Sequence, residues 1–392
     1  MNLEDIIKDT NTYYCLECGK CTSVCPVARY DKCFSPRMII ENALLGFEDE
    51  LVLDRELFSC LTCYMCQSEC PSDVDFPVFV REARSLAQGK GQHGICAHSG
   101  QLQSLARLMT SPNLKQKRLE WLSQEHRVSE KSDVLFWVGC APYFEPIFED
   151  IGFSALGITK ASLKILNSLG IEPKLLPNER CCGHDALWTG DVDTFKKLAE
   201  YNAAQIKEAG VKKIVFACPE GYRTFKLDYP DYVDLDCEVQ HISELLAEKI
   251  AENSHLSGKL MEIKKKVTYQ DPCRLGRHLG VYDAPRKILE AIPGIELVEM
   301  KHSGLEAICC GTSAFTNCDS YSNALRAERL SEAVETGAEL LITACPKCQT
   351  HFRCAQVDKG EEHRPTPKIE VIDLINLVAD AIGEGGKSSK KK

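Results

Sequence analysis

The cysteines with the clearest chemical meaning lie between residues 273 and 348. Adjacent Cys309 and Cys310 are separated from Cys273 by 35 residues and from Cys345 by 34, and Cys348 completes the pattern C-x35-CC-x34-C-x2-C, in which Gly311 directly follows the pair. Five thiols exceed the four ligands of a structural zinc site. Several soft thiolates instead suit a polynuclear iron–sulfur centre. The alternative is a set of buried structural cysteines without a metal.

Two further groups of cysteines stand near the N-terminus, in CLECGKCTSVCP and CLTCYMCQSECP. Both match C-x2-C-x2-C-x3-C-P, the run that binds 4Fe–4S cubanes in two-cluster ferredoxins, where each fourth cysteine ligates the other cluster. A zinc site is the alternative. The predicted ligand sets are Cys15, Cys18, Cys21 and Cys70 for one cubane, and Cys60, Cys63, Cys66 and Cys25 for the other.

Four candidate ligands, two of them from the five-cysteine group, follow short apolar runs that are typical of buried strands. VLFWVGC, VKKIVFAC, KVTYQDPC and ELLITAC each end in a cysteine, and helical stretches lie between them. Alternating strands and helices predict mainly parallel sheets covered by helices. Ligands of such sheets gather beyond the carboxyl ends of the strands, so distant thiols can meet there. The cysteines at these four ends are Cys140, Cys218, Cys273 and Cys345.

This region is internally duplicated. CCGHDALW corresponds to CCGTSAF, FACPEGYRTF to TACPKCQTHF, and CEVQHISELLAEKI to IEVIDLINLVADAI at an offset of 132 residues. A repeat of this length is a duplicated domain, and we place its halves at 131–258 and 262–382. The first half has Gly221 where the second has Cys348. The four thiols of the first half are Cys140, Cys181, Cys182 and Cys218. With or without His184, they predict an iron–sulfur cluster or a single metal of a different type from the second half. The alternative is a vacant site left over from the duplication.

The other segments are predicted from local signals. Residues 1–90 are expected to form a small helical ferredoxin-like domain, with a helix starting at Ser35-Pro36. Residues 91–130 are expected to be a linker with a polar helix around SPNLKQKRLEWLSQEH, in which His93 and His98 are connector residues or, alternatively, ligands. The Gly/Ser/Lys-rich residues 383–392 are expected to be a disordered basic tail.

Composition excludes several classes of function. A hydrophobic content of 44% is enough for a sizeable core, and a net charge of −10 argues against a nucleic-acid surface. Neither a secretory signal nor a membrane-spanning apolar run is predicted, so the 22 cysteines are expected in a reducing cytoplasm. Five cysteines outside the groups are interpreted as small buried apolar residues: Cys33, Cys96, Cys237, Cys318 and Cys354.

On these motifs the sequence resembles the heterodisulfide reductase family, and most closely its fused D-type subunit, which joins a C-type ferredoxin part to a B-type part with two CCG domains. The resemblance implies an α+β multidomain chain with two cubanes. It also implies a non-cubane 4Fe–4S centre on the five cysteines around Cys309, where a disulfide is reductively cleaved. Gly221 departs from the full pattern. Iron–sulfur subunits of glycolate oxidase, anaerobic glycerol-3-phosphate dehydrogenase and sulfite-reduction complexes share this architecture.

The resemblance therefore implies an oxidoreductase subunit that acts on the CoM-S-S-CoB heterodisulfide, a trisulfide or a related sulfur compound. The competing hypothesis is an electron-transfer subunit between a flavin dehydrogenase and a membrane quinone or cytochrome partner. Expected partners are a flavoprotein, a cytochrome b and a small disulfide or sulfur-carrier protein, in the cytoplasm or at the inner face of the membrane. Four basic residues are interpreted either as a binding site for an anionic substrate or as a solvated basic face. They are Arg274, Arg277, His278 and Lys347.

Overall fold

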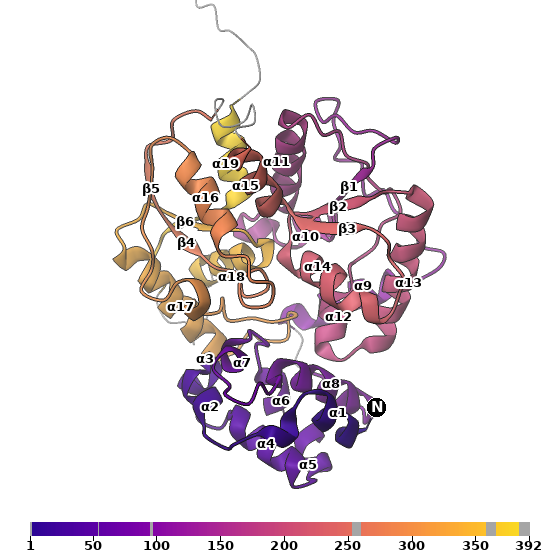
Figure 1. Ribbon diagram of the computed structural model, residues 1–392, viewed down its shortest axis with the longest axis vertical. Coiled ribbons are helices and arrows are strands. Elements are labelled where there is room, and N and C mark those ends of the chain that lie inside the picture. Colours follow the sequence, from indigo (N-terminus) through magenta and orange to yellow (C-terminus); the bar gives the residue numbers. More distant parts are fainter. Residues whose placement is uncertain (1, 54, 95–96, 253–259, 358–365, 384–392) are drawn as a thin grey trace, which may run out of the picture.

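The computed structural model describes residues 2–53, 55–94, 97–252, 260–357 and 366–383. The N-terminal part is a cluster of short helices that lies beneath two α/β halves (Figure 1). Ser35 caps the fourth helix through its side chain, which accepts a hydrogen bond from the Met38 N–H, as the Ser-Pro start predicts. The helices are α1 (Leu3–Asp9), α2 (Lys20–Val24), α3 (Pro26–Tyr30), α4 (Pro36–Leu44), α5 (Glu48–Leu53), α6 (Glu56–Ser59), α7 (Met65–Ser68) and α8 (Phe76–Gly89), with a 3₁₀ turn η1 at Thr12–Tyr14.

The linker differs from the prediction. Its helix is α9 (Gln101–Leu108), whereas the segment expected to be a polar helix, residues 111–126, consists of turns and irregular backbone. The side chains of this segment bind the first half instead of lying on a solvated helix. Arg118, for example, is buried and donates to the backbone and carboxylate of Glu179. These tertiary contacts override the local helical pattern.

The first half is built on a parallel sheet of three strands in the order β1-β2-β3, and Val134 of β1 pairs with Lys213 of β2. Helices α11 and α13 are the longest that accompany it. The strands are β1 (Val134–Trp137), β2 (Lys213–Phe216) and β3 (Glu238–His241). The helices are α10 (Ala141–Ile147), α11 (Ala155–Ser168), α12 (His184–Thr189), α13 (Val192–Ala209), α14 (Pro219–Arg223) and α15 (Ile242–Ala251).

The second half repeats this plan with a four-stranded parallel sheet in the order β5-β4-β6-β7. All four apolar runs predicted to be strands are strands, and both sheets are parallel, so the predicted fold class is confirmed. The strands are β4 (Lys265–Gln270), β5 (Ile295–Leu297), β6 (Leu340–Thr343) and β7 (Glu370–Asp373). The helices are α16 (Asp283–Ala291), α17 (Ser320–Glu335), α18 (Pro346–Val357) and α19 (Leu374–Ile382).

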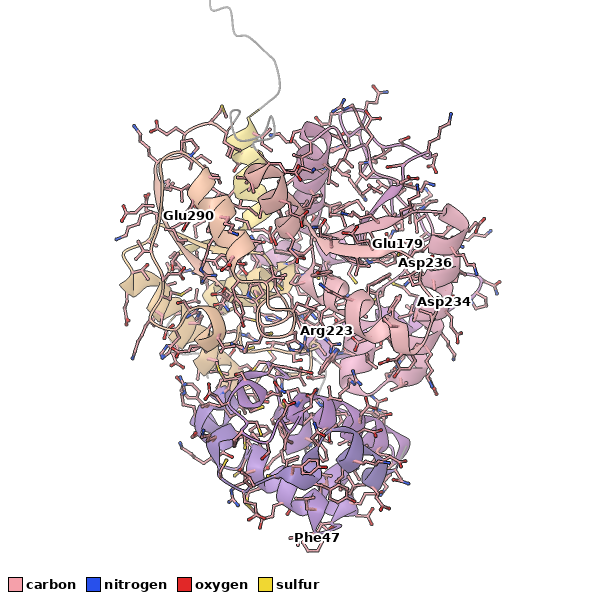
Figure 2. The ribbon with its side chains drawn as sticks, in the orientation of Figure 1. Phe47, Glu179, Arg223, Asp234, Asp236 and Glu290 are labelled. Carbon is pink, nitrogen blue, oxygen red and sulfur yellow. The ribbon has the colours of Figure 1, made fainter. Side chains whose placement is uncertain are left out.

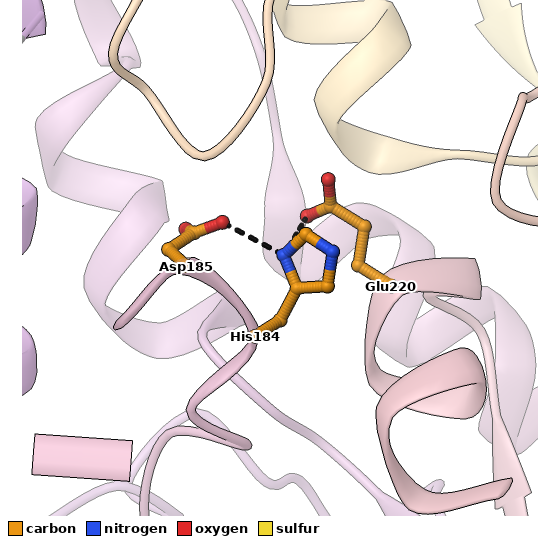
Figure 3. Close-up of side chains that lie close together, drawn as sticks. All are labelled: His184, Asp185 and Glu220. Carbon is orange, nitrogen blue, oxygen red and sulfur yellow. Dashed lines mark hydrogen bonds and ion pairs between the residues drawn. The ribbon is translucent and has the colours of Figure 1, made fainter. Parts of the chain in front are cut away.

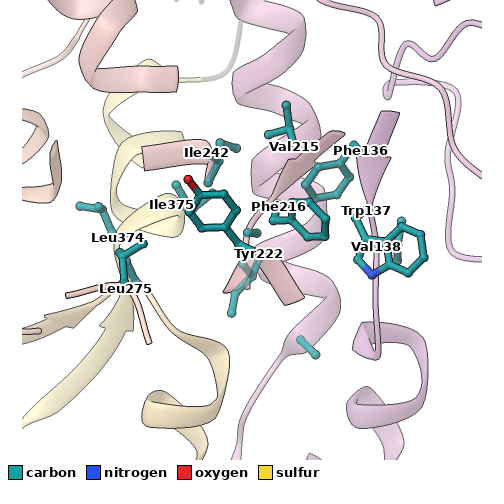
Figure 4. Packing of buried hydrophobic residues seen from close by; sticks show 14 of the residues in the cluster. Phe136, Trp137, Val138, Val215, Phe216, Tyr222, Ile242, Leu275, Leu374 and Ile375 are labelled. Carbon is teal, nitrogen blue, oxygen red and sulfur yellow. The ribbon is translucent and has the colours of Figure 1, made fainter. Parts of the chain in front are cut away.

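One apolar core joins the two halves. Phe136 and Phe216 from the first sheet and Ile375 from α19 belong to the same buried cluster (Figure 4). The last helix of each half packs against the first long helix of the other half, α15 on α16 and α19 on α11. Each fully buried apolar side chain contributes roughly 1.5–3 kcal/mol. Among the described residues, no helix has both the length and the apolar character needed to cross a bilayer.

Candidate iron–sulfur sites

The five cysteines of the second half come together at the carboxyl ends of its strands. Cys273 follows β4, Cys345 follows β6, and Cys348 lies in the first turn of α18. Gly311 has a φ of +85°, and a Cβ there would lie 2.8 Å from the carbonyl oxygen of Ser322. Glycine is therefore required directly after Cys309 and Cys310, because the left-handed backbone and the close approach both exclude a side chain.

The thiols of this second-half site contact one another in a chain. Cys309 interacts with Cys273 and Cys310, and Cys348 interacts with Cys310 and Cys345. Hydrogen bonds from Cys309 and then Cys348 lower the pKa of Cys310 to about 6. A thiolate is the form of cysteine that binds metals, so this buried group is chemically suited to a polynuclear metal centre.

One residue of this site was missed from the sequence. His351 lies on α18, one turn after Cys348, and its Nδ1 is 3.2 Å from the sulfur of Cys310. The imidazole is buried, and its Nε2 has no hydrogen-bond partner among the described residues. The spacing C-x2-H in CPKCQTH could have indicated it, because residues three apart share one face of a helix.

The N-terminal cysteines form two sets that cross between the motifs. A small cavity of about 30 Å³ is lined by all four members of the first predicted set, including Cys18 and Cys70. In the second set, burial raises the pKa of Cys25, and the neighbouring Cys63 and Cys60 raise it further. The structure thus places Cys70 with the thiols of the first motif and Cys25 near the thiols of the second.

The two motif loops have the same backbone shape. Glu17 and Gly19 in the first loop and Thr62 and Tyr64 in the second all have positive φ. This conformation winds the backbone around the thiols, and the Thr62 N–H donates to the sulfur of Cys60 over 3.3 Å. Backbone N–H groups directed at sulfur stabilise thiolates, so both loops fit a bound iron–sulfur cluster.

In the first half, the four cysteines line a cavity of about 70 Å³. The sulfurs of Cys140 and Cys181 are 3.7 Å apart. A Cβ on Gly221 would lie 4.0 Å from the sulfur of Cys182, so the glycine stands where a fifth thiol would complete the set. Glu179 fixes the loop before Cys140 by accepting from the Gly139 N–H over 2.5 Å.

Three further metal-ligating side chains lie beside this cavity, His184, Asp185 and Glu220 (Figure 3). The two carboxylates already bind a cation of the protein itself, the ammonium of Lys347, which is 2.6 Å from Asp185 and 2.5 Å from Glu220. Burial opposes the charge on Lys347, but these carboxylates outweigh it and raise its pKa. His184 is engaged at both nitrogens, by Asp185 and Arg274, so the idea that it supplements the first-half thiols is not supported.

The residues interpreted as a substrate grip or a solvated basic face hold the domains together. Arg274 is 3% exposed and donates to the carbonyl and hydroxyl of Thr62, while Arg277 donates to the carbonyl of Cys63. His278 also lies 3.0 Å from the carbonyl of Thr62. A solvated face is therefore wrong, since Arg274 is buried, and Arg277 and His278 half-buried, against the second N-terminal motif.

The remaining candidates lie apart from these sites. His98 packs its ring against Phe148 and Phe315, at centroid distances of 5.3 and 6.4 Å, as a connector residue would. His93 is exposed. The interpretation of the spare cysteines as buried is wrong for Cys33 and Cys318, which are exposed. Cys237 and Cys354 are partly buried, and Cys96 lies outside the described residues.

Comparison with known proteins places these sites in a family. The 4Fe-4S dicluster domain matches residues 11–74, and the CCG cysteine-rich domain matches 134–226 and 267–353. The D-type subunit of the dihydromethanophenazine:CoB–CoM heterodisulfide reductase from Methanosarcina barkeri is 34% identical over 276 residues, which are 68% of this chain and 63% of the relative. The chain belongs to the heterodisulfide reductase family of iron–sulfur subunits.

Relatives of this heterodisulfide reductase-type chain have more than one named role. The EtfAB:quinone oxidoreductase of Syntrophomonas wolfei is 29% identical over 253 residues, which are 62% of this chain and 34% of that protein. A hypothetical protein from Helicobacter pylori shares the fold, with a TM-score of 0.56 at 12% identity over 90% of this chain and 68% of the other. The chain spans 63% of the length of the Methanosarcina relative.

Proposed function

We propose that this chain relays single electrons through two 4Fe–4S cubanes to a non-cubane 4Fe–4S centre, where a disulfide or trisulfide is reductively cleaved. The cubanes would be bound by the two crossed cysteine sets, and the non-cubane centre by the second-half set. The observation that carries the proposal is the meeting of five thiols in the second half next to the second N-terminal motif. Cys309 and Cys63 lie within electrostatic range of each other.

The order of the sites supports a relay. Cys21 of the first set interacts electrostatically with Cys66 of the second set. Cys63 of the second set in turn interacts with Cys309 of the second-half site. Arg277 ties these last two loops together, because it donates to the carbonyls of Cys63 and Ala307. Bound clusters would supply one-electron steps, while cleavage of a disulfide takes two electrons, so a second-half centre that holds a half-reduced sulfur species is needed.

The protein's own groups would prepare the second-half centre. The thiolate character of Cys310 favours metal binding, and His351 and Lys347 lie within electrostatic range of each other beside the site. Burial of Cys309, Cys310, Cys345 and Cys348 keeps bulk water from the reacting sulfur. The first half, with Gly221 in place of a fifth ligand, would hold a cluster or metal of a different type. That centre would transfer electrons or stabilise the fold.

The test compares Cys310→Ser with the equivalent change in the first half, Cys182→Ser, in the anaerobically reconstituted full chain. Disulfide-dependent oxidation of reduced viologen is measured with iron analysis and EPR on the same samples. Cys310→Ser should abolish disulfide cleavage and leave both cubane signals intact, whereas Cys182→Ser should reduce turnover less. Full turnover by Cys310→Ser would move the chemistry elsewhere, and zinc with little iron would refute the cubanes.

The second candidate function is electron transfer without catalysis, between a flavin dehydrogenase and a membrane quinone or cytochrome. The likeness to a protein named as a quinone oxidoreductase favours it. The two candidates differ in one result. Wild-type protein that carries all its clusters, accepts electrons from viologen and fails to reduce any disulfide offered would be the electron-transfer subunit.

A further inference from the structure

The first cysteine set is the place where the series of sites reaches the protein surface. Of the seventeen candidate ligand cysteines, all within the described residues, Cys18 alone is exposed. The second-half thiols Cys309, Cys310, Cys345 and Cys348 are buried, as are the thiols of Cys60, Cys63 and Cys66. One-electron transfer between two proteins requires their redox centres to approach closely, so the edge at Cys18 is the accessible end of the series.

Large exposed apolar side chains stand next to this set in the sequence. Tyr13, Tyr14 and Leu16 are 57%, 68% and 68% exposed and lie within two residues of Cys15. Leu16 also lines the cavity between the four cysteines of the first set. Exposed apolar residues scattered singly need no explanation, but a group of three beside a redox site marks a contact surface, and tyrosine is enriched at protein interfaces.

The charge of the same surface indicates what kind of protein fits it. Glu17 lies within the group and is exposed, as are three acidic residues of α1, the helix that contacts η1. These four acidic side chains outnumber the two exposed lysines of the same segments, Lys8 and Lys20. Residues 1–90 carry fifteen acidic and nine basic side chains, so this domain holds much of the chain's negative charge. Complementary charge steers protein encounters and increases their rate.

We propose that Tyr13, Tyr14 and Leu16 form the docking surface for a one-electron carrier protein that presents basic side chains around an apolar contact. This inference rests on the proposed function, because it assumes a cubane on Cys15, Cys18, Cys21 and Cys70. The carrier exchanges one electron at a time with that cubane through the exposed edge at Cys18. The acidic rim orients the carrier, and the tyrosine rings exclude water from the contact.

The test measures oxidation of the reduced full chain by cytochrome c, a basic one-electron haem protein, in a stopped-flow instrument. The Tyr13→Ala/Tyr14→Ala variant leaves the cavity-lining Leu16 in place. Its second-order rate constant should fall about tenfold, as for loss of an interface anchor. The wild-type rate should fall as salt is added, and an acidic plant-type ferredoxin should react more slowly.

The matched control is Leu45→Ala/Phe47→Ala, which removes two side chains that are 61% and 47% exposed in the same domain. Phe47 lies at the outer tip of the domain (Figure 2). This control should react with cytochrome c as the wild type does, and ferricyanide should oxidise all three proteins equally fast. An unchanged rate in the tyrosine variant, or an equal loss in the control or with ferricyanide, overturns the docking surface. Absence of cubane EPR in the wild type would instead refute the proposed function.

Discussion

Lys347 and Glu220 occupy equivalent positions of the duplicated halves, and they form an ion pair with each other across the boundary between the halves. The ammonium lies 2.5 Å from the carboxylate, and both side chains are largely buried. Each residue stands two positions after a candidate ligand, Cys345 or Cys218, and these thiols also interact electrostatically. The two cysteine sites are therefore joined at this contact.

Replacing Lys347 with methionine should lower the melting temperature by several degrees. The change leaves Asp185 and Glu220 buried without a cation, and breaking a buried ion pair from one side costs about 3–5 kcal/mol. Adding Glu220→Gln should restore part of the loss. Circular dichroism melts of cluster-loaded protein provide the measurement, with Lys212→Met, at an exposed ion pair with Asp133, as a control that should not change. Equal melting of the Lys347 and Lys212 variants would contradict this role.

Gly221→Cys should convert the first-half site toward the second-half type. The new Cβ would lie 4.0 Å from the sulfur of Cys182 and 3.3 Å from the ring of Phe216, which requires only a small shift. We expect more iron per chain and a second EPR signal like that of the second-half centre. Gly221→Ser, of similar size without a thiol, is the control. A variant with wild-type iron content and spectra would show that the missing thiol does not determine the first-half centre.

His351→Leu should lower the reduction potential of the second-half centre. The imidazole lies 3.2 Å from the sulfur of Cys310, and an N–H donated to a ligand thiolate favours the reduced centre. A tenfold shift in a one-electron equilibrium is about 59 mV. His351→Asn can place its amide near Nδ1 and should restore the potential, while the cubane potentials stay constant as an internal reference. Loss of the centre in both variants would make His351 a ligand instead.

Asp373→Asn should stabilise the protein at pH 8. Burial raises the pKa of Asp373 to about 7, and its Oδ2 has no hydrogen-bond partner among the described residues. The unfolded chain loses this proton near pH 4 and the folded chain only near pH 7, so wild-type stability falls as pH rises between these values. The gain at pH 8 is on the order of 2–4 kcal/mol, since each pKa unit is worth about 1.4 kcal/mol.

Urea denaturation at pH 5 and pH 8 would measure the effect of Asp373→Asn. Its Oδ1 should continue to accept from the Ile375 N–H, which caps α19. Asp191→Asn, at the N-cap of α13, is the matched control, because it makes the same change at a carboxylate that also caps a helix. If Asp373→Asn were equally stabilising at both pH values, titration of Asp373 would not be the cause.

The parts that could be predicted from the sequence are those with a local signal. Cysteines such as Cys273 and Cys345 end apolar runs, so both the strands and the meeting of the thiols followed from the pattern. The role of Arg274 could not be predicted, because its partner Thr62 is 212 residues away and a lone arginine carries no sign of its contact. The failed helix at 111–126 has the same origin, since contacts with Glu179 determine the path of Arg118.

The last helix of each half packs on the other half, and this reciprocal packing bears on how the two halves arose. α15 packs on α16 and α19 packs on α11, so the same pair of surfaces is used twice, once in each direction. Two identical subunits related by a twofold axis make contacts of this isologous kind. The fold therefore has the geometry of a homodimer whose subunits have been joined into one polypeptide. Once joined, the two copies no longer had to share one sequence, and a change such as glycine for cysteine at position 221 could be confined to one of them.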